Sequence, residues 1–162
     1  MAEEKPMKTS SVEGTGSRGF RFERLEAWQL ARAFNRSVYR VSRGFPKEEA
    51  FALTSQIRRA SVSVSSNIAE GSGRNSDADF AHFLEIAYGS LMEVVSQLYL
   101  ALDEKYLGET AFRALADEAD MLAGKIAALT KALGRKPRIA GLQKSRAESG
   151  ASRAQSSGSP RP

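Results

Sequence analysis

Cysteine is absent from this 162-residue sequence, and histidine occurs once, as His82. The lack of cysteine excludes disulfides, thiolate catalysis and cysteine-ligated zinc, and it is compatible with a reducing compartment. Carboxylate-bridged metal sites in helix bundles need two Glu-x-x-His motifs, so the stretch from Asp79 to His82 is not such a site. Without a histidine near them, the many serines support no catalytic triad. We therefore expect a protein with no enzymatic activity, no metal and no cofactor.

Long apolar runs are also missing. The longest is far shorter than a bilayer span, and the opening residues MAEEKPMKTS contain acidic side chains and no apolar signal core. Gly71-Ser72-Gly73 is too short for a phosphate-binding loop and follows no predicted strand. These patterns predict a cytoplasmic protein with no contact with the membrane.

Charge is unevenly distributed along the chain, whose formal net charge is +5. Residues 135–162 hold seven basic residues and one acidic residue, and they are rich in Gly, Ser, Pro and Arg. Residues 1–19 lack apolar periodicity. Because neither segment can bury enough apolar surface to offset its ordering entropy, both are predicted to be disordered tails. The single predicted domain, 20–134, has a basic half (20–74, ten basic and five acidic residues) and an acidic half (75–134, four and ten).

Within this domain, apolar residues recur every three or four positions, which predicts helices over 27–41, 53–68, 80–102 and 112–133. The stop and start signals agree. Gly44 ends the first helix and Pro46 is placed to open the second; Ser76 and Asp79 resemble a capping box, and Gly134 closes the fourth helix. Four helices with short connections predict an all-α, antiparallel up-down-up-down four-helix bundle.

The stretch SVSVSSNI, residues 61–68, alternates like a strand, but its flanks favour a helix. Leu53, Ile57, Val64 and Ile68 continue a helical spacing through it. In a helix Val62 and Val64 point to nearly opposite sides, so the two valines belong to two different apolar edges of the helix. The serines fill the remaining positions.

Several helices carry more apolar side chains than the core stripe of one bundle needs. In the second helix Phe51 and Val62, with Arg58 between them, lie away from Leu53 and Ile57. The third helix is apolar almost all round, through the residues Tyr88, Met92, Val95, Tyr99 and Tyr106 on one side and Ile86 and Leu100 on the other. A wide core is one interpretation. We favour an interface of a homo-oligomer, because contiguous apolar surface usually marks one.

Arginines dominate the face of the first helix opposite its core stripe. At 100° per residue they fall within an arc of about 100°; they are Arg21, Arg32, Arg36, Arg40 and Arg43. Trp28 and Tyr39 border this arc, and arginines interleaved with aromatics are suited to phosphates and unpaired bases. A solvated helix face and aromatic interface anchors are the alternatives. The basic C-terminal tail strengthens the nucleic-acid interpretation.

Asn67, Glu70 and Glu93 lie off the main polar faces, near the predicted interior or a subunit boundary. A carboxylate there needs a partner. The candidate cations are Arg58, Arg59 and Arg74. We expect a structural ion pair and no catalytic role.

Five successive blocks of the sequence resemble a known family. They are LEAWQ (25–29), FPKEE (45–49), LTSQIRRA (53–60), SNIAEG (66–71) and IAYGSLME (86–93). In this order, over residues 20–133, they resemble the four-helix-bundle proteins named after the 23S rRNA intervening sequence. The resemblance implies a small bacterial bundle that assembles as a homopentamer and has a basic surface suspected of binding nucleic acid. It also implies a relation to the accessory variability protein of diversity-generating retroelements, which partners a reverse transcriptase and RNA, and it gives the SNIAEG and IAYGSLME blocks structural or assembly roles.

Taken together, the residues and the resemblance predict a non-enzymatic homopentamer that binds RNA or DNA through the first helix and the basic tail. The alternative is a protein-binding scaffold that makes no contact with nucleic acid.

Overall fold

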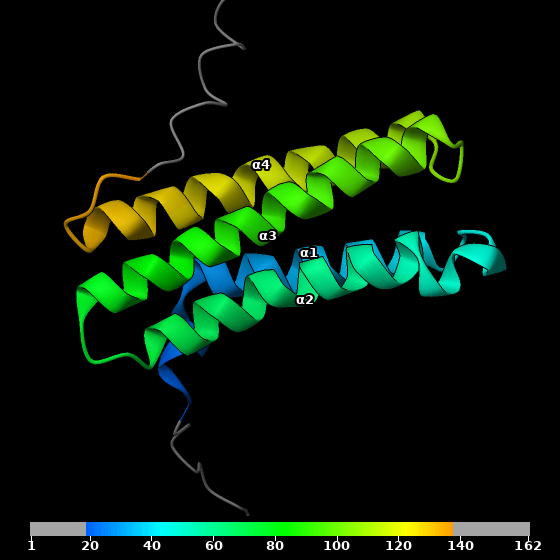
Figure 1. Ribbon diagram of the computed structural model, residues 1–162. Helices are drawn as coiled ribbons and strands as arrows, with labels where there is room; N and C mark the ends of the chain where they lie inside the picture. Colours follow the sequence, from blue (N-terminus) through cyan, green and yellow to red (C-terminus); the bar gives the residue numbers. More distant parts are fainter. Residues whose placement is uncertain (1–18, 138–162) are drawn as a thin grey trace, which may run out of the picture.

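The computed structural model describes residues 19–137 (Figure 1), and within this range the secondary structure is entirely helical. The elements are η1 (Arg21–Arg24), α1 (Glu26–Ser42), η2 (Lys47–Phe51), α2 (Leu53–Ser72), α3 (Asp77–Asp103) and α4 (Glu109–Ala132). The all-α prediction is therefore confirmed. The two predicted tails lie almost entirely outside the described residues.

The four α-helices form a closed antiparallel bundle. Each helix packs against the next one along the chain, and α4 packs back against α1. Figure 1 shows that the two ends of the described chain lie at the same end of the bundle. This arrangement confirms the predicted up-down-up-down topology.

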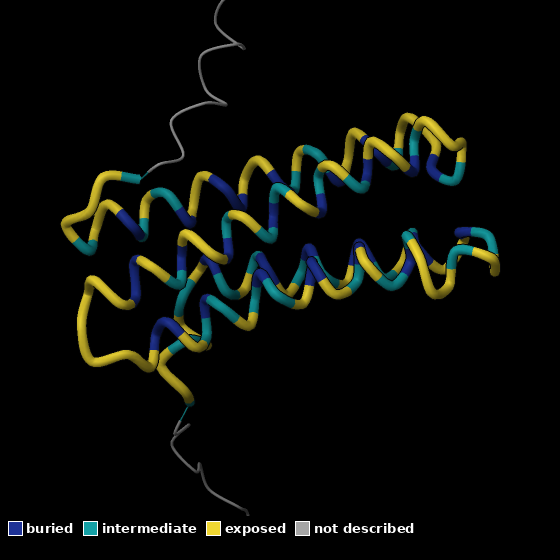
Figure 2. Tube along the Cα trace, viewed as in Figure 1, coloured by how far each residue is buried: buried dark blue, intermediate teal, exposed yellow. Residues whose placement is uncertain are grey.

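The core lies along the bundle axis, where all four helices contribute fully buried side chains (Figure 2). The largest include Phe34, Ile57, Leu91, Leu122 and Ile126. Burying one such side chain contributes roughly 1.5–3 kcal/mol. The apolar spacing of three and four residues thus accounts for both the helices and the faces that they bury.

The serine-rich stretch 61–68 lies inside α2, as predicted. Ser61 and Val64 are buried, whereas Val62 is exposed. The hydroxyls are satisfied locally, since Ser61 Oγ donates to the Arg58 carbonyl at 2.9 Å and Ser65 Oγ to the Val62 carbonyl at 3.0 Å. The small serine side chains therefore let this part of α2 pack closely against its neighbours while the buried Ser61 hydroxyl stays paired.

The connection between α1 and α2 contains a short helix that the sequence pattern does not predict. Pro46 is followed by the short 3₁₀ helix η2, and α2 begins only at Leu53. Between them Ala52 has φ −109° and ψ −110°, which interrupts helical geometry. Pro46 therefore opens η2, and the prediction that it opens the second helix is wrong.

The predicted end signals of the last two helices are confirmed. At the start of α3, Ser76 Oγ accepts a hydrogen bond from the Asp79 backbone N–H at 3.1 Å, and the Ser76 hydroxyl donates to Asp79 Oδ2 at 2.6 Å. After α4, Gly134 adopts φ 71°, the left-handed conformation that favours glycine at a helix end.

Candidate nucleic-acid interface

Four of the five predicted arginines share the outer face of α1. Arg32, Arg36, Arg40 and Arg43 are all exposed, and they lie opposite the buried Phe34. Within residues 19–137, the side chains of Arg36 and Arg43 make no hydrogen bond or ion pair. We call these four residues the arginine face. Its guanidinium groups are presented to solvent with little internal neutralisation.

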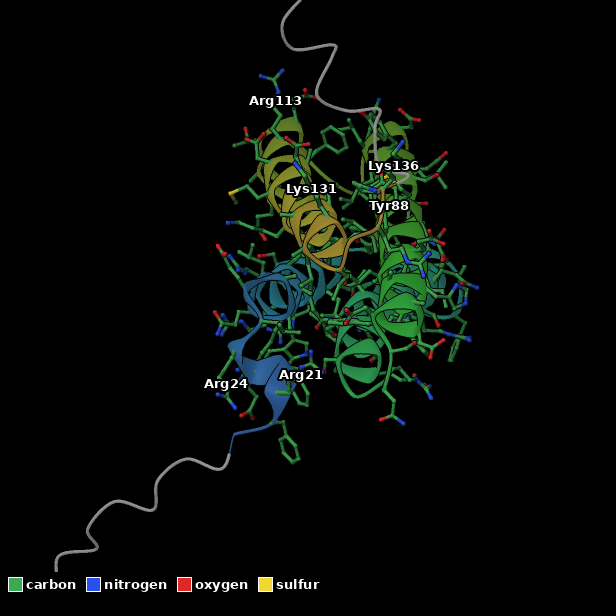
Figure 3. The ribbon with its side chains drawn as sticks, turned by 90° about the vertical axis from the view of Figure 1, so that its left-hand side faces the viewer. Arg21, Arg24, Tyr88, Arg113, Lys131 and Lys136 are labelled. Carbon is green, nitrogen blue, oxygen red and sulfur yellow. The ribbon has the colours of Figure 1, made fainter. Side chains whose placement is uncertain are left out.

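Arg21, the fifth, is not part of this face, so its predicted place in the arc is wrong. It belongs to η1, which is separated from α1 by Leu25 in an extended conformation (φ −79°, ψ 118°). Arg21 Nη1 donates to the Ser72 carbonyl at 3.1 Å, and the guanidinium lies 5.9 Å from the Phe80 ring centroid. Figure 3 views the bundle from this end. A cation near the last carbonyl groups of α2 interacts favourably with the negative end of the helix dipole, so Arg21 has a structural role.

Trp28 and Tyr39 border the arginine face but already have partners. The centroids of the Trp28 and Phe22 rings lie 4.8 Å apart, and the Arg32 guanidinium carbon lies 5.8 Å from the Trp28 centroid. Tyr39 lies 5.0 Å from the Arg58 guanidinium. Both residues are half-buried, so each offers only part of its surface to a ligand.

A groove of about 820 Å³ adjoins the arginine face between α1 and α4. Its lining includes Leu30, Ser37, Arg36, Arg40, Arg43, Glu118 and Met121. Ser37 Oγ donates to Glu118 Oε1 at 3.1 Å, and Arg40 Nη2 donates to Ser37 Oγ at 3.3 Å. The groove therefore joins a cationic rim to a half-buried carboxylate.

Sequence reasoning missed Glu118. It lies 81 residues from Ser37 in the chain, and its own helical pattern marks it only as a polar residue beside the apolar stripe. Only the packing of α4 against α1 reveals the pairing.

A second groove, of about 640 Å³, lies between η2, α1 and α2. It brings together three of the residues predicted to form an interface, namely Phe51, Arg58 and Val62, beside Tyr39. Phe51 is 97% exposed. Arg58 is held in place, because its Nε donates to Ser42 Oγ at 2.8 Å while its plane lies over Tyr39.

The remaining predicted polar residues have separate structural roles. Asn67 Nδ2 donates to the Ser63 carbonyl at 2.8 Å and to Ser63 Oγ at 3.0 Å, and Ser63 Oγ lies 2.9 Å from Ser90 Oγ on α3. Asn67 thus belongs to a polar seam between α2 and α3.

The carboxylates are more exposed than predicted. Glu70 forms the expected ion pair, with Arg74, but its side chain is 55% exposed and does not lie near the interior. Glu93 is also exposed and accepts a hydrogen bond from Gln97 Nε2 at 3.1 Å. A surface pair one helical turn apart contributes little to stability, so these residues need no catalytic explanation.

On α3, Tyr88 and Met92 are half-buried and pack against the core of their own bundle. The wide-core interpretation therefore accounts for part of this edge. Tyr99 remains 54% exposed although its ring lies 4.7 Å from that of Phe112. The other exposed large apolar residues on the helices and η2 are Phe51, Val62, Ile86, Leu100 and Met121.

The described residues contain no candidate metal site and no candidate membrane span. No group of three or more His, Cys, Asp or Glu side chains in the range 19–137 is placed to hold a metal ion. None of the helices described is long and apolar enough to cross a membrane.

The sequence model of the 23S rRNA-intervening sequence protein family matches residues 23–128. A search of curated proteins found no match. A solved structure from Bacteroides thetaiotaomicron, a protein of unknown function from the S23 ribosomal protein family, has the same fold: the TM-score is 0.60 at 20% identity, over 65% of this chain and 98% of that one. Since the family match covers more than half of the sequence, the chain belongs to the 23S rRNA-intervening sequence protein family.

Proposed function

We propose that this protein is a non-enzymatic, cytoplasmic homo-oligomer that binds RNA or DNA through the arginine face of α1. The observation that carries the proposal is the set of exposed guanidinium groups on one helix face, two of which make no hydrogen bond or ion pair within residues 19–137. Arginine suits this task because its planar fork matches phosphate oxygens and stacks on bases. The basic segment 135–162 adds phosphate affinity that does not depend on sequence.

One subunit offers few phosphate contacts, so assembly is part of the proposed mechanism. The resemblance of the sequence blocks implies a ring of five, and a ring would hold several arginine faces at high effective concentration. Phe51 and Val62 on one groove, and Ile86 and Leu100 on α3, are apolar residues that a neighbouring subunit would cover. Weak individual contacts would then add to useful affinity.

The test is charge reversal on the arginine face. Arg32→Glu with Arg36→Glu should lower retention of a mixed RNA and DNA pool by at least about tenfold at low salt, because opposite charges replace two phosphate contacts. The matched control is Arg113→Glu with Lys131→Glu, which changes net charge equally on α4 (Figure 3). Equal losses in both variants would argue for a non-specific charge effect and against this face.

Truncation after Gly134 separates the tail from the helix. If the truncated protein loses most of its retention while the α1 variant does not, the tail is the binding element. A full-length protein that retains neither RNA nor DNA even at low ionic strength would contradict the proposal. That outcome would favour a protein-binding scaffold, for which the exposed Phe51 groove is the supporting observation.

A further inference from the structure

We infer that the groove between α1 and α4 binds an unpaired guanine base, with Glu118 reading the base and the arginines on the rim holding the strand. This inference rests on the proposed nucleic-acid function and narrows its ligand to single-stranded segments that contain guanosine.

The groove contains one carboxylate, that of Glu118. Glu118 lies in the groove beside Arg36 and Arg40, where a site for phosphate alone would be weakened by a like charge. Its Oε1 accepts from Ser37 Oγ at 3.1 Å, and an ionised carboxylate has about four acceptor positions, so it can still accept from a ligand. The complementary ligand carries N–H donors at one end and negative charge at the other. A nucleotide has both.

Guanine matches this carboxylate in the geometry of its donors. The guanine Watson–Crick edge offers two parallel N–H donors, from the ring N1 and the exocyclic amine, and a carboxylate accepts such a pair in bidentate fashion. Adenine and cytosine offer one amino group each. The hydroxyl of Ser37, which is 8% exposed, lies between Arg40 and Glu118 and limits rotation of the carboxylate. Guanine is therefore the best-matched base.

The groove also accommodates the rest of the nucleotide. The groove volume of about 820 Å³ lies within the range of small-molecule sites. Leu30, Ala33 and the 57%-exposed Met121 supply an apolar wall for the ring. Arg36, Arg40 and Arg43 lie along one side of α1. At 1.5 Å per residue this row of arginines is about 10 Å long, which exceeds the size of one phosphate group. The rim thus suits a strand better than a free mononucleotide.

The strand must be unpaired at this guanosine, because the edge that Glu118 reads is occupied by cytosine in a duplex. The phosphates stay at the solvent-exposed rim, away from the carboxylate, and the neutral base enters the groove.

The experiment measures binding of the full-length protein to uridine-rich oligonucleotides that carry one central guanosine, inosine or adenosine, by fluorescence anisotropy. Inosine lacks only the exocyclic amine, so the wild type should bind the guanosine strand about tenfold more tightly than the inosine strand, as expected for one hydrogen bond to a charged group. Glu118→Gln should abolish this preference, because one of the two acceptor oxygens becomes an amide donor, and it should weaken binding of the guanosine strand more than binding of the inosine strand. Its amide oxygen can still accept from Ser37, which favours retention of the fold.

The matched control is Asp117→Asn, which removes the same charge from an exposed position on α4 that does not line the groove. It should keep the guanosine preference. A wild type that binds all three strands equally would overturn this inference and leave the proposed function standing, whereas the absence of any binding at low salt would overturn both. Guanosine monophosphate that competes at the same concentration as the oligonucleotide would overturn the assignment to a strand.

Discussion

At the residue scale, Gly71 shows how closely α2 and α3 approach. It is buried near the end of α2, and a Cβ placed on it would lie 2.6 Å from Phe83 Cβ and 2.7 Å from Phe80 Cδ2. The Phe83 Cβ is fixed to the α3 backbone, so the overlap can be relieved only by moving the helices apart. The glycine therefore sets the separation of the two helices at this end of the bundle.

Gly71→Ala should lower the free energy of unfolding by about 1–3 kcal/mol, because overpacking exceeds the gain in helix propensity. The control is Gly124→Ala in α4, where an added Cβ meets nothing within 4 Å. That variant should gain roughly 0.8–1 kcal/mol, the helix-propensity difference between the two residues. Urea denaturation measures both. A Gly71→Ala protein as stable as the wild type would show that α2 and α3 can separate at little cost.

Tyr106 gives a prediction about pH. It packs 6.1 Å from Phe45, and its hydroxyl donates to Glu49 Oε1 at 3.4 Å. Burial, and then the negative charges of Glu49, Glu104 and Glu48, raise the pKa of Tyr106 above its ordinary value of 10.0. The folded state thus holds this proton more tightly than the unfolded state. Its contribution to stability is complete below pH 10 and is lost as pH rises through the folded pKa.

The melting temperature of the wild type should accordingly fall more steeply above pH 10 than that of Tyr106→Phe, which cannot ionise at this position. Thermal denaturation at several pH values on both sides of 10 measures the difference. Parallel curves for the two proteins would mean that Tyr106 ionises equally easily in the folded and unfolded chains.

At the scale of elements, the start of α3 depends on one side chain. Ser76 accepts from the Asp79 N–H, and no other described residue caps the first turn of α3 through its side chain. Ser76→Ala should lower the free energy of unfolding by about 1 kcal/mol, within the usual range for an N-cap. Ser76→Asp, which keeps an acceptor oxygen, should lose much less. A Ser76→Ala protein with unchanged urea midpoint would assign the helix start to packing of Phe80 alone.

Local patterns predict well where the helices lie, but they predict less well where each side chain lies relative to neighbouring elements. The spacing of Ile57, Val64 and Ile68 alone places SVSVSSNI in a helix, and the Ser76 cap is visible because it acts over three residues. The misplacement of Arg21 arises at Leu25, whose extended conformation has no marker such as Gly or Pro.

The candidate site was less predictable than the helices, because it depends on contacts between distant segments. The outer face of α1 follows from helical geometry, so Arg32 and Arg36 could be predicted to share it. The Ser37–Glu118 hydrogen bond joins residues 81 positions apart and depends on which helix packs beside α1. Nothing in either local pattern specifies that neighbour.

At the scale of the whole molecule, charge is divided between the two halves of the bundle. Residues 20–74, which include α1 and α2, hold ten basic and five acidic side chains, whereas residues 75–134, which include α3 and α4, hold four and ten. Identical halves facing each other would repel, but the basic half of one copy attracts the acidic half of the next. Contacts of this head-to-tail kind generate rings when the rotation closes. The charge pattern thus supports cyclic assembly.

In the proposed assembly, a neighbouring subunit covers Phe51, the most exposed of the large apolar residues described. Phe51 is 97% exposed at the edge of the groove between η2, α1 and α2. Its burial in a partner would contribute roughly 1.5–3 kcal/mol to the free energy of association per interface. Phe51→Ser should therefore shift the assembly toward a 17.6 kDa monomer in light scattering. Phe20→Ser is the matched control, since Phe20 is 68% exposed in the segment before η1, outside that groove. Loss of assembly in both variants would indicate non-specific hydrophobic association. A wild type that is already a compact monomer at micromolar concentration would contradict the proposed mechanism, because the arginine faces would then lack the multivalency on which the proposed binding depends.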